Sequence, residues 1–554
     1  MKQRWLFSGR YNEYSWKSFK NDLFAGLIVG VIAIPLGMAF AIAAGVKPEY
    51  GLYTTIIAGI LISLFGGSKY QIGGPTGAFI PVLFGIVVAY GYDNLLVAGF
   101  LAGLILLLMG MFKLGSLIKF IPRPVILGFT AGIAIIIFTG QIAYFLGLKD
   151  VERHESFFSN IQEIITHIQS INLYSVLTAV ICLMALLLVP KLFPKIPGSL
   201  VGLLLSTVIA NLFYPSQIAT IGTTFGEISS SLPEFAIPEI TFQQLQQLIG
   251  PAFVIAMLGS IESLLSAVVA DGMTREKHHS NRELIGQGMA NIVTPLFGGI
   301  PATGAIARTA TNIKNGAVSP FSGVIHSITV LVVLILLAPY ASTIPLASMA
   351  PILMAVAWNM SEKHHFYHLL KTKTSDSLVL IVTFLLTIFV NLTVAVEVGL
   401  LLAIVFFIKH MSGIMISTKV FARLNIEHEQ RTIRMIETCR NHEQMSIYHV
   451  EGPLFFGAAQ TFERSLENAI IHKPQILLLE MQSVPFIDTT GEYYLSRMIT
   501  DFSKDGVVLI SGLKQQPKNM LSKTGLANII GESHFFQHTS DAIDFALSRL
   551  KKSV

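Results

Sequence analysis

The stretch QIGGPTGA at residues 71–78 decides how we interpret the fold, because FGGIPATGA at residues 297–305 repeats its features. In both stretches a Gly-Gly pair and a proline come before a Thr-Gly-Ala triplet, and an offset of 227 carries Thr76 to Thr303. The same offset relates two further pairs, Gly45 with Gly272 and Pro124 with Pro351. We interpret this offset as an internal repeat, with copies at about 21–215 and 248–415.

The chain around these stretches is too apolar for water to be its main solvent. Of 554 residues, 52% are hydrophobic and 13% are charged, whereas soluble proteins carry about 25% charged residues. Apolar runs recur near the 20-residue length that an α-helix needs to cross a bilayer, and we count about fourteen crossings. Charged residues become frequent only toward the C-terminus. We expect a cytosolic N-terminus at 1–20, a transmembrane domain at 21–415, a linker at 416–440 and a small soluble domain at 441–554.

Basic residues set the orientation of these crossings. With fourteen crossings and an inside N-terminus, the outer segments hold only Lys47, Lys149 and Arg153, and the cytosolic segments hold the other basic residues near the membrane. We therefore expect a multi-pass protein of the inner (plasma) membrane with both termini cytoplasmic. The first apolar run is too long for a secretory signal, and it opens a polytopic chain. Seven crossings per repeat is an odd number, so the second copy is inverted relative to the first, as in many secondary transporters.

The two Gly-rich stretches predict the binding site. Interrupted hydrophobic segments at matching positions of two repeats mark discontinuous helices that meet at the membrane midplane. We expect each helix to start near its Thr-Gly-Ala triplet, with Pro75 or Pro301 at or just before the start. Two helix N-termini would then offer unpaired N–H groups and partial positive charge to one spot, which suits an anion. The alternative is that the glycines only allow close helix packing.

Two charged residues lie within the predicted membrane part. Glu262 interrupts the apolar run 253–270, and an acid there is a functional candidate by default; the alternative is a protonated, hydrogen-bonded structural carboxyl. An ionised Glu262 would repel a nearby anion, so binding should favour the state that carries a proton or Na⁺, which couples the two ions. Arg308 follows Gly304 by one turn and either faces the site as a countercharge or extends to the cytosolic interface.

Other motifs carry less information. The histidine groups lie in predicted cytosolic loops where a solvated surface is the simpler explanation, so we predict no metal site; they are His278, His279, His364, His365 and His368. The two cysteines imply no disulfide framework. The sequence has no P-loop, nucleophile-elbow or zinc spacing, so we expect neither an enzyme nor an ATP-driven pump, and the net charge of +5 is no evidence for nucleic-acid binding.

The sequence resembles the SulP anion permeases, called solute carrier family 26 in animals. The likeness rests on IPLGMAFA at residues 34–41 with YGLY at 50–53, GPTG at 74–77, residues 263–281 and Arg308, and it covers nearly the whole membrane part. It implies a uracil-permease-like, all-α fold of seven plus seven inverted spans, in which a core moves against a gate. One departure is Leu36, where many relatives carry a glutamine that contributes to the site.

The resemblance also implies which residues line the site. It carries a substrate-binding role to Phe40, Thr76, Gly77, Ala78, Thr303, Gly304, Ala305 and Arg308. Bacterial relatives with an acid at the Glu262 position tend to be cation-coupled symporters, which agrees with the electrostatic argument. We expect no cofactor beyond Na⁺ or H⁺ as the coupling ion.

The soluble tail has the pattern of an α/β domain. Strand-like runs at 446–450, 475–481 and 507–510 alternate with helical stretches at 458–471, 492–502 and 541–550. The tail resembles the STAS domain that closes SulP proteins, and IDTTG at 487–491 is similar to its loop signature. In soluble STAS proteins the hydroxyl before that glycine, here Thr490, is a kinase target; the alternative is a helix N-cap. We expect the domain to support a homodimer, trafficking or regulation.

The functional expectation is an H⁺- or Na⁺-coupled symporter of a small anion such as sulfate, bicarbonate or a dicarboxylate, working by alternating access. An uncoupled anion exchanger or channel, and a nucleobase permease of the same fold, remain alternatives, as does a membrane-anchored sensor without transport.

Overall fold

The computed structural model describes residues 14–116, 121–193, 197–230, 233–238, 241–414, 416–419, 444–458, 462–463 and 474–552. Most of the predicted N-terminal segment and linker, and most of the tail helix predicted at 458–471, lie outside these residues. The chain divides into two compact units, Met1–Leu401 and Leu402–Val554.

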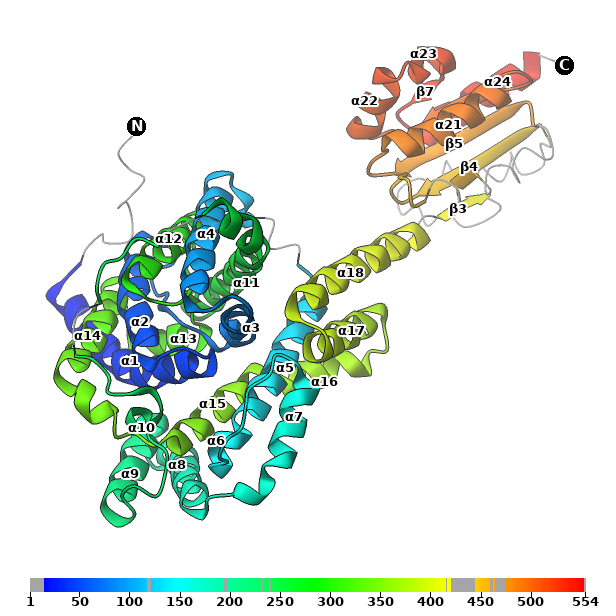
Figure 1. Ribbon diagram of the computed structural model, residues 1–554. Coiled ribbons are helices and arrows are strands. Elements are labelled where there is room, and N and C mark those ends of the chain that lie inside the picture. The colour runs from blue at the N-terminus through cyan, green and yellow to red at the C-terminus, as the bar shows by residue number, and fades with distance from the viewer. Residues whose placement is uncertain are drawn as a thin grey trace. The chain divides into compact units, whose positions relative to one another are not determined.

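The first unit is built almost entirely from helices (Figure 1). Its elements, including the helix that continues past its end, are α1 (Trp16–Ala43), α2 (Pro48–Phe65), β1 (Gly73–Gly74), η1 (Gly77–Phe79), α3 (Ile80–Tyr90), α4 (Tyr92–Met111), α5 (Arg123–Gly140), α6 (Ile142–Leu146), α7 (Phe157–Thr166), η3 (Ile168–Ser170), α8 (Leu173–Leu192), α9 (Gly198–Phe213), α10 (Ile221–Phe225), α11 (Phe242–Thr274), α12 (Ser280–Val293), η4 (Thr294–Phe297), β2 (Thr303–Gly304), α13 (Ile306–Lys314), α14 (Phe321–Ala341), α15 (Leu346–Met360), α16 (Lys363–Lys371), α17 (Ser375–Phe389) and α18 (Leu392–Ile414).

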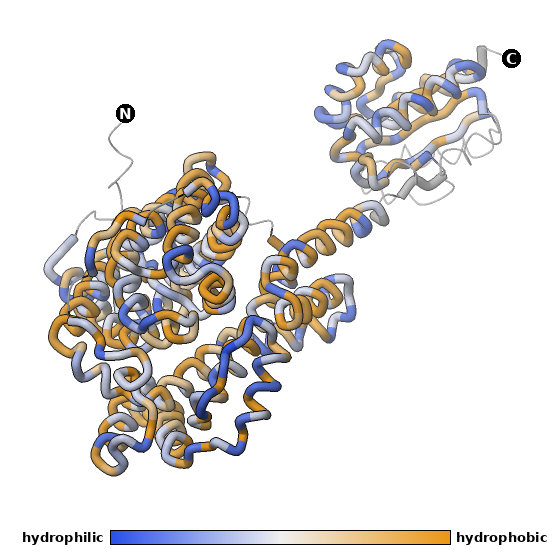
Figure 2. The backbone as a smooth tube through the Cα atoms, in the orientation of Figure 1, coloured by the Kyte–Doolittle hydropathy of each residue, from blue (hydrophilic) through white to orange (hydrophobic). Residues whose placement is uncertain are grey.

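Among the described residues, eight helices are long and apolar enough to cross a membrane. Shorter apolar helices lie at Gly77–Tyr90, Gly198–Phe213 and Ser375–Phe389. Figure 2 shows hydrophobic residues along most of the helices of this unit. The unit is therefore a polytopic membrane domain, while the number of fourteen crossings stays a prediction.

Most helices of the first unit form two groups. The core group is α1–α4 with α11–α14, and the gate group is α5–α9 with α15–α17. Each group takes helices from both predicted repeats, as an inverted repeat would arrange them. Small residues allow close packing inside each group. In the core group, a Cβ on Gly26 of α1 would lie 2.5 Å from a backbone oxygen of α14, and in the gate group a Cβ on Gly128 of α5 would lie 2.8 Å from a backbone oxygen of α17.

The second unit is an α/β domain, as the sequence predicts. Its five-stranded sheet has the order β3-β4-β5-β6-β7, in which β3 is antiparallel to β4 and the other neighbours are parallel. One face packs on α21, α22 and α23, and the other on α24. Beyond the end of α18, the elements are β3 (Ile416–Lys419), β4 (Met445–Glu451), β5 (Ile476–Ser483), α21 (Thr489–Phe502), β6 (Val507–Ser511), α22 (Gln515–Lys523), α23 (Leu526–Ile530), η5 (Glu532–His534), β7 (Phe535–Phe536) and α24 (Thr539–Lys552).

Three features of this unit differ from the sequence expectation. Strand β3 occupies the first part of the segment expected to be a linker. The short elements β7, α22 and α23 were not expected from the sequence. Finally, Asp488 and not Thr490 caps α21, since its carboxylate accepts a 2.7 Å hydrogen bond from the Gly491 N–H. Thr490 lies in the first turn and is partly exposed, and its phosphorylation stays a prediction.

Candidate functional site

The two Gly-rich stretches of the sequence meet inside the core group. Strands β1 and β2 pair antiparallel, with Gly73 opposite Gly304 and Gly74 opposite Thr303. Gly74 has a φ of +151°, and a Cβ there would lie 2.7 Å from a guanidinium nitrogen of Arg308, so only glycine fits at this position. Residues from the two predicted repeats are therefore joined by backbone pairing at one place.

A helix starts shortly after each of these strands. After β1, the 3₁₀ turn η1 begins at Gly77 and continues into α3, and after β2 the helix α13 begins at Ile306. Pro75 lies two residues before η1, as expected, but Pro301 precedes β2 and lies five residues before α13, so its expected place at a helix start was wrong. The first N–H groups of both helices have no partner within their helix and point out of its N-terminal end. The Ala305 N–H is not among them, since it donates to the Ile72 carbonyl over 2.8 Å.

Glu262 lies beside the first of these helix starts. It is carried by α11, a 33-residue helix that begins with a capping box between Thr241 and Gln244. The Thr76 hydroxyl, one residue before η1, donates a 2.8 Å hydrogen bond to the Glu262 carboxylate. Thr303 also contacts α11, where its hydroxyl donates to the Gly259 carbonyl over 2.9 Å. Glu262 is thus held at the site by a residue of the opposite repeat.

Arg308 is buried and does not extend to the cytosolic interface. Only 3% of the residue is exposed, and one guanidinium nitrogen, Nη2, donates to the Pro75 carbonyl. The other, Nη1, is buried without a hydrogen-bond partner among the described residues. Arg308 and Glu262 interact electrostatically. Of the two alternatives for Arg308, the structure therefore supports a buried cation beside the paired strands.

The site lies where the core group meets the gate group. A Cβ on Gly77 would contact Phe40 of α1 at 3.6 Å, Ile137 of α5 at 3.5 Å and Met360 of α15 at 3.0 Å. Phe40 belongs to the core group, whereas Ile137 and Met360 come from the gate group and are apolar. Around Gly77, the core group therefore supplies the polar and charged atoms described above, and the two gate residues contribute apolar contacts.

Sequence reasoning missed the role of Gln71, although this residue opens the first of the two Gly-rich stretches. The Gln71 side chain is 2% exposed, donates to the Ser263 carbonyl over 3.0 Å and fills the space beside Gly304.

His326 of α14 was also missed. It is fully buried, its Nε2 has no partner within the described residues, and it interacts electrostatically with Arg308. The only signal in the sequence was a titratable side chain within an apolar helix.

The weaker candidates from the sequence remain apart from this site. His278 lies after α11, where its Nδ1 is 2.8 Å from the Asp271 carboxylate, and His364, His365 and His368 lie on the surface helix α16. No group of three or more metal-ligating side chains occurs among the residues that the structure describes.

Comparison with known proteins identifies the family. Residues 19–383 match the Sulfate permease family, and residues 438–542 match the STAS domain. YvdB of Bacillus subtilis (strain 168), whose name assigns it provisionally to sulfate transport, is 56% identical over 96% of this chain and 98% of its own. The bicarbonate transporter BicA of a Picosynechococcus species is 31% identical over 93% of this chain and 92% of its own.

A solved structure agrees with the fold. The murine Slc26a9 anion transporter in its inward-facing state has a TM-score of 0.84 at 21% identity, covering 97% of this chain and 93% of that one. Together with the membrane helices and the α/β tail, these matches place the chain among membrane transporters and not among enzymes. The chain belongs to the sulfate permease family and carries a C-terminal STAS domain.

Proposed function

We propose that this protein is a secondary active transporter that moves a small anion together with Na⁺ or H⁺ by alternating access. The observation that carries the proposal is the pairing of Gly73 with Gly304, which brings two helix starts and the buried Arg308 to one place. Substrate would bind the first N–H groups of η1 and α13, near Phe40 and Thr76. Ala305 would lie beside the substrate without donating to it, because its N–H already donates to the Ile72 carbonyl.

The charges around this place support an anion as the substrate. Each helix start contributes roughly half a positive charge, and Arg308 contributes a full one, so the total is about two positive charges. The unpartnered Nη1 of Arg308 is a buried donor, and such a donor costs about 1–3 kcal/mol unless a ligand or water accepts from it. A bound oxyanion would remove that cost.

Glu262 supports coupling to a cation. Ionised, it would cancel part of the positive charge and repel a bound anion by about 3 kcal/mol at ~6 Å and an effective dielectric near 20. A proton or Na⁺ on the carboxylate removes this repulsion, so cation and anion bind best together. The hydrogen bond from Thr76 holds the carboxylate next to one of the proposed anion-binding helix starts.

Sulfate and bicarbonate are the substrates to test first, and a dicarboxylate comes next. YvdB is named for sulfate and BicA for bicarbonate, and both match nearly the whole chain. With a cation on Glu262, about two positive charges remain, which matches a divalent anion such as sulfate better than bicarbonate. Membership in the sulfate permease family also sets a nucleobase permease aside.

We also propose how the protein is oriented in the membrane and that it forms a homodimer. The distribution of basic residues favours cytoplasmic termini and a location in the plasma membrane. The Ala43 end of α1 then lies toward the outside, because Trp16 begins that helix near the cytosolic N-terminus. The STAS domain supports the proposal of a homodimer.

Uptake into proteoliposomes tests the function. Radiolabelled sulfate, bicarbonate and a C4-dicarboxylate are each supplied with no gradient, with an inward Na⁺ gradient and with an inward proton gradient. We expect one anion to accumulate above equilibrium with one of the two gradients. Flux that only dissipates the anion's own gradient would instead show a channel or exchanger, and no flux of any anion would contradict a transport role.

A further inference from the structure

A connection of the gate group reaches across to the core group at the end of the membrane domain that we assign to the outside. This connection, residues 147–156, joins α6 to α7 and is called the strap below. Hydrogen bonds attach the strap to two helices of the gate group. The His154 N–H donates to Asn160 of α7 over 2.9 Å, and the Leu148 N–H donates to the Ala143 carbonyl of α6 over 2.9 Å.

Arg153 at the middle of the strap binds the last turn of α1. Its Nη1 donates to the Ile42 carbonyl over 3.1 Å and to the Ala43 carbonyl over 3.2 Å. The last carbonyls of a helix lack partners in the helix and carry partial negative charge, so a guanidinium is a well-matched ligand for them. Phe40 of the proposed site is only one turn away on the same helix.

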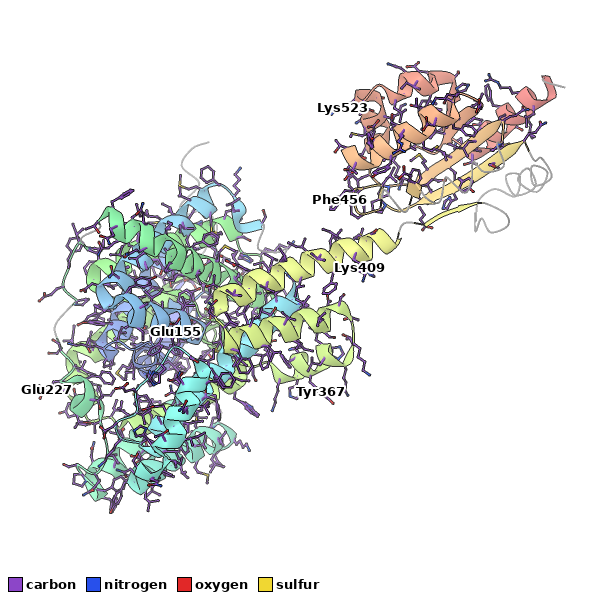
Figure 3. All side chains as sticks on the ribbon, turned by 45° about the vertical axis from the view of Figure 1, so that its right-hand side comes forward. Glu155, Glu227, Tyr367, Lys409, Phe456 and Lys523 are labelled. Atoms are coloured by element: carbon purple, nitrogen blue, oxygen red, sulfur yellow. The ribbon has the colours of Figure 1, made fainter. Side chains whose placement is uncertain are left out.

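Aromatic rings from both groups enclose this guanidinium. Its carbon lies 5.9 Å from the ring centre of Phe84 on α3 and 5.0 Å from that of Tyr144 on α6, within the range of cation–π attraction. The strap touches α3 a second time, because a Cβ on Gly85 would lie 3.4 Å from the Glu155 carboxylate. Figure 3 shows Glu155 beside the blue ribbon of the N-terminal helices.

We propose that Arg153 is a positioning residue of the transport cycle, and that the strap closes the outer side by holding α1 and α3 of the core group against the gate group. The inference rests on the proposed function, because alternating access requires the core and gate groups to separate on one side at a time. Outward opening must then break the bonds from Arg153 to α1. A strap that only stabilised the fold would stay closed throughout the cycle.

Thiol labelling tests this role without depending on substrate. In a chain with Cys182 and Cys439 replaced, Phe40→Cys is exposed to a membrane-impermeant maleimide from the outside. We expect Arg153→Ala to raise the labelling rate on the order of tenfold, and Arg153→Lys to raise it less. The matched control is Lys149→Ala, because Lys149 is a cation of the same strap with an exposed side chain. Equal rates with and without Arg153 would overturn the proposal.

Cross-linking provides a second test that keeps the arginine in place. A short, reducible bifunctional thiol reagent joins Gly85→Cys to Glu155→Cys and locks the strap to α3. We expect uptake of the transported anion to fall at least tenfold after cross-linking and to recover on reduction. Full uptake by the cross-linked protein would show that the strap does not open and would overturn the proposal. Uptake by the unmodified chain, measured alongside, shows separately whether the proposed function itself holds.

Discussion

The substitution Gly304→Ala tests whether the paired strands form the site. A Cβ at this position would lie 1.6 Å from the Gln71 amide nitrogen and 2.5 Å from its amide carbon, whereas ordinary contacts begin at 3.4 Å. Gln71 is 2% exposed, so its side chain cannot move aside without losing its bond to Ser263 or displacing β2. Overpacking of this kind costs about 1–3 kcal/mol, and a displacement of about 1 Å in a functional site can cost 100-fold in rate.

A double-mutant cycle assigns the effect to this contact. We expect Gly304→Ala to reduce anion uptake in proteoliposomes by roughly 100-fold, and Gln71→Ala combined with Gly304→Ala to recover much of that loss. Gly272→Ala is the matched control, because no atom lies within 4 Å of a Cβ built there. Uptake that is unchanged in Gly304→Ala, or a double mutant no better than Gly304→Ala, would refute the argument. Thermal unfolding of each variant separates loss of the site from loss of the fold.

Three further predictions concern charged groups. Glu262→Gln should retain uptake but lose its dependence on Na⁺ or pH, and unchanged ion dependence of accumulation would refute the coupling role. Arg308→Lys keeps the charge but loses a forked donor, so we expect the KM for the anion to rise about tenfold, measured by initial uptake rates; an unchanged KM would contradict a role in binding. In the second unit, a hydrogen bond to Glu480 raises the pKa of His449. The stability that this pair contributes is therefore complete below the ordinary histidine pKa of 6.5 and is lost as pH rises through the raised value. Hydrogen exchange over β4 and β5 in the full chain, corrected for its intrinsic pH dependence, should show this loss, and His449→Gln should abolish it; an equal loss in that variant would refute the assignment.

The sequence predicted the parts of the structure that follow from repeated local patterns. The offset between Thr76 and Thr303 led to the expectation that two interrupted helices meet, and β1 and β2 pair at that place. Alternation of strands and helices was likewise enough to predict the α/β class of the tail. In both cases the backbone conformation, an interrupted helix or a strand followed by a helix, restricts which residues can occur locally, so the sequence pattern reveals it.

The remaining features depend on contacts between distant residues. Whether Arg308 turned inward or outward could not be decided from the sequence, since its long side chain allows both, and the neighbouring space is set by Gly74 in the other repeat. The contact of Gln71 with Gly304 and the bond of Arg153 with α1 join segments more than a hundred residues apart. The place of Pro301 was wrong because an extended pair replaced the expected helix start.

The division of chemistry between the two helix groups has a consequence for how selectivity and speed can change. The polar and charged atoms near the paired strands come from helices that pack as one body, while Ile137 and Met360 offer only hydrocarbon and sulfur. In a transporter arranged in this way, the bound anion can keep its contacts with the core group while the apolar side chains of the gate group move relative to it. Mutations in one body would then alter which ion is carried, and mutations in the other would alter how fast it is delivered.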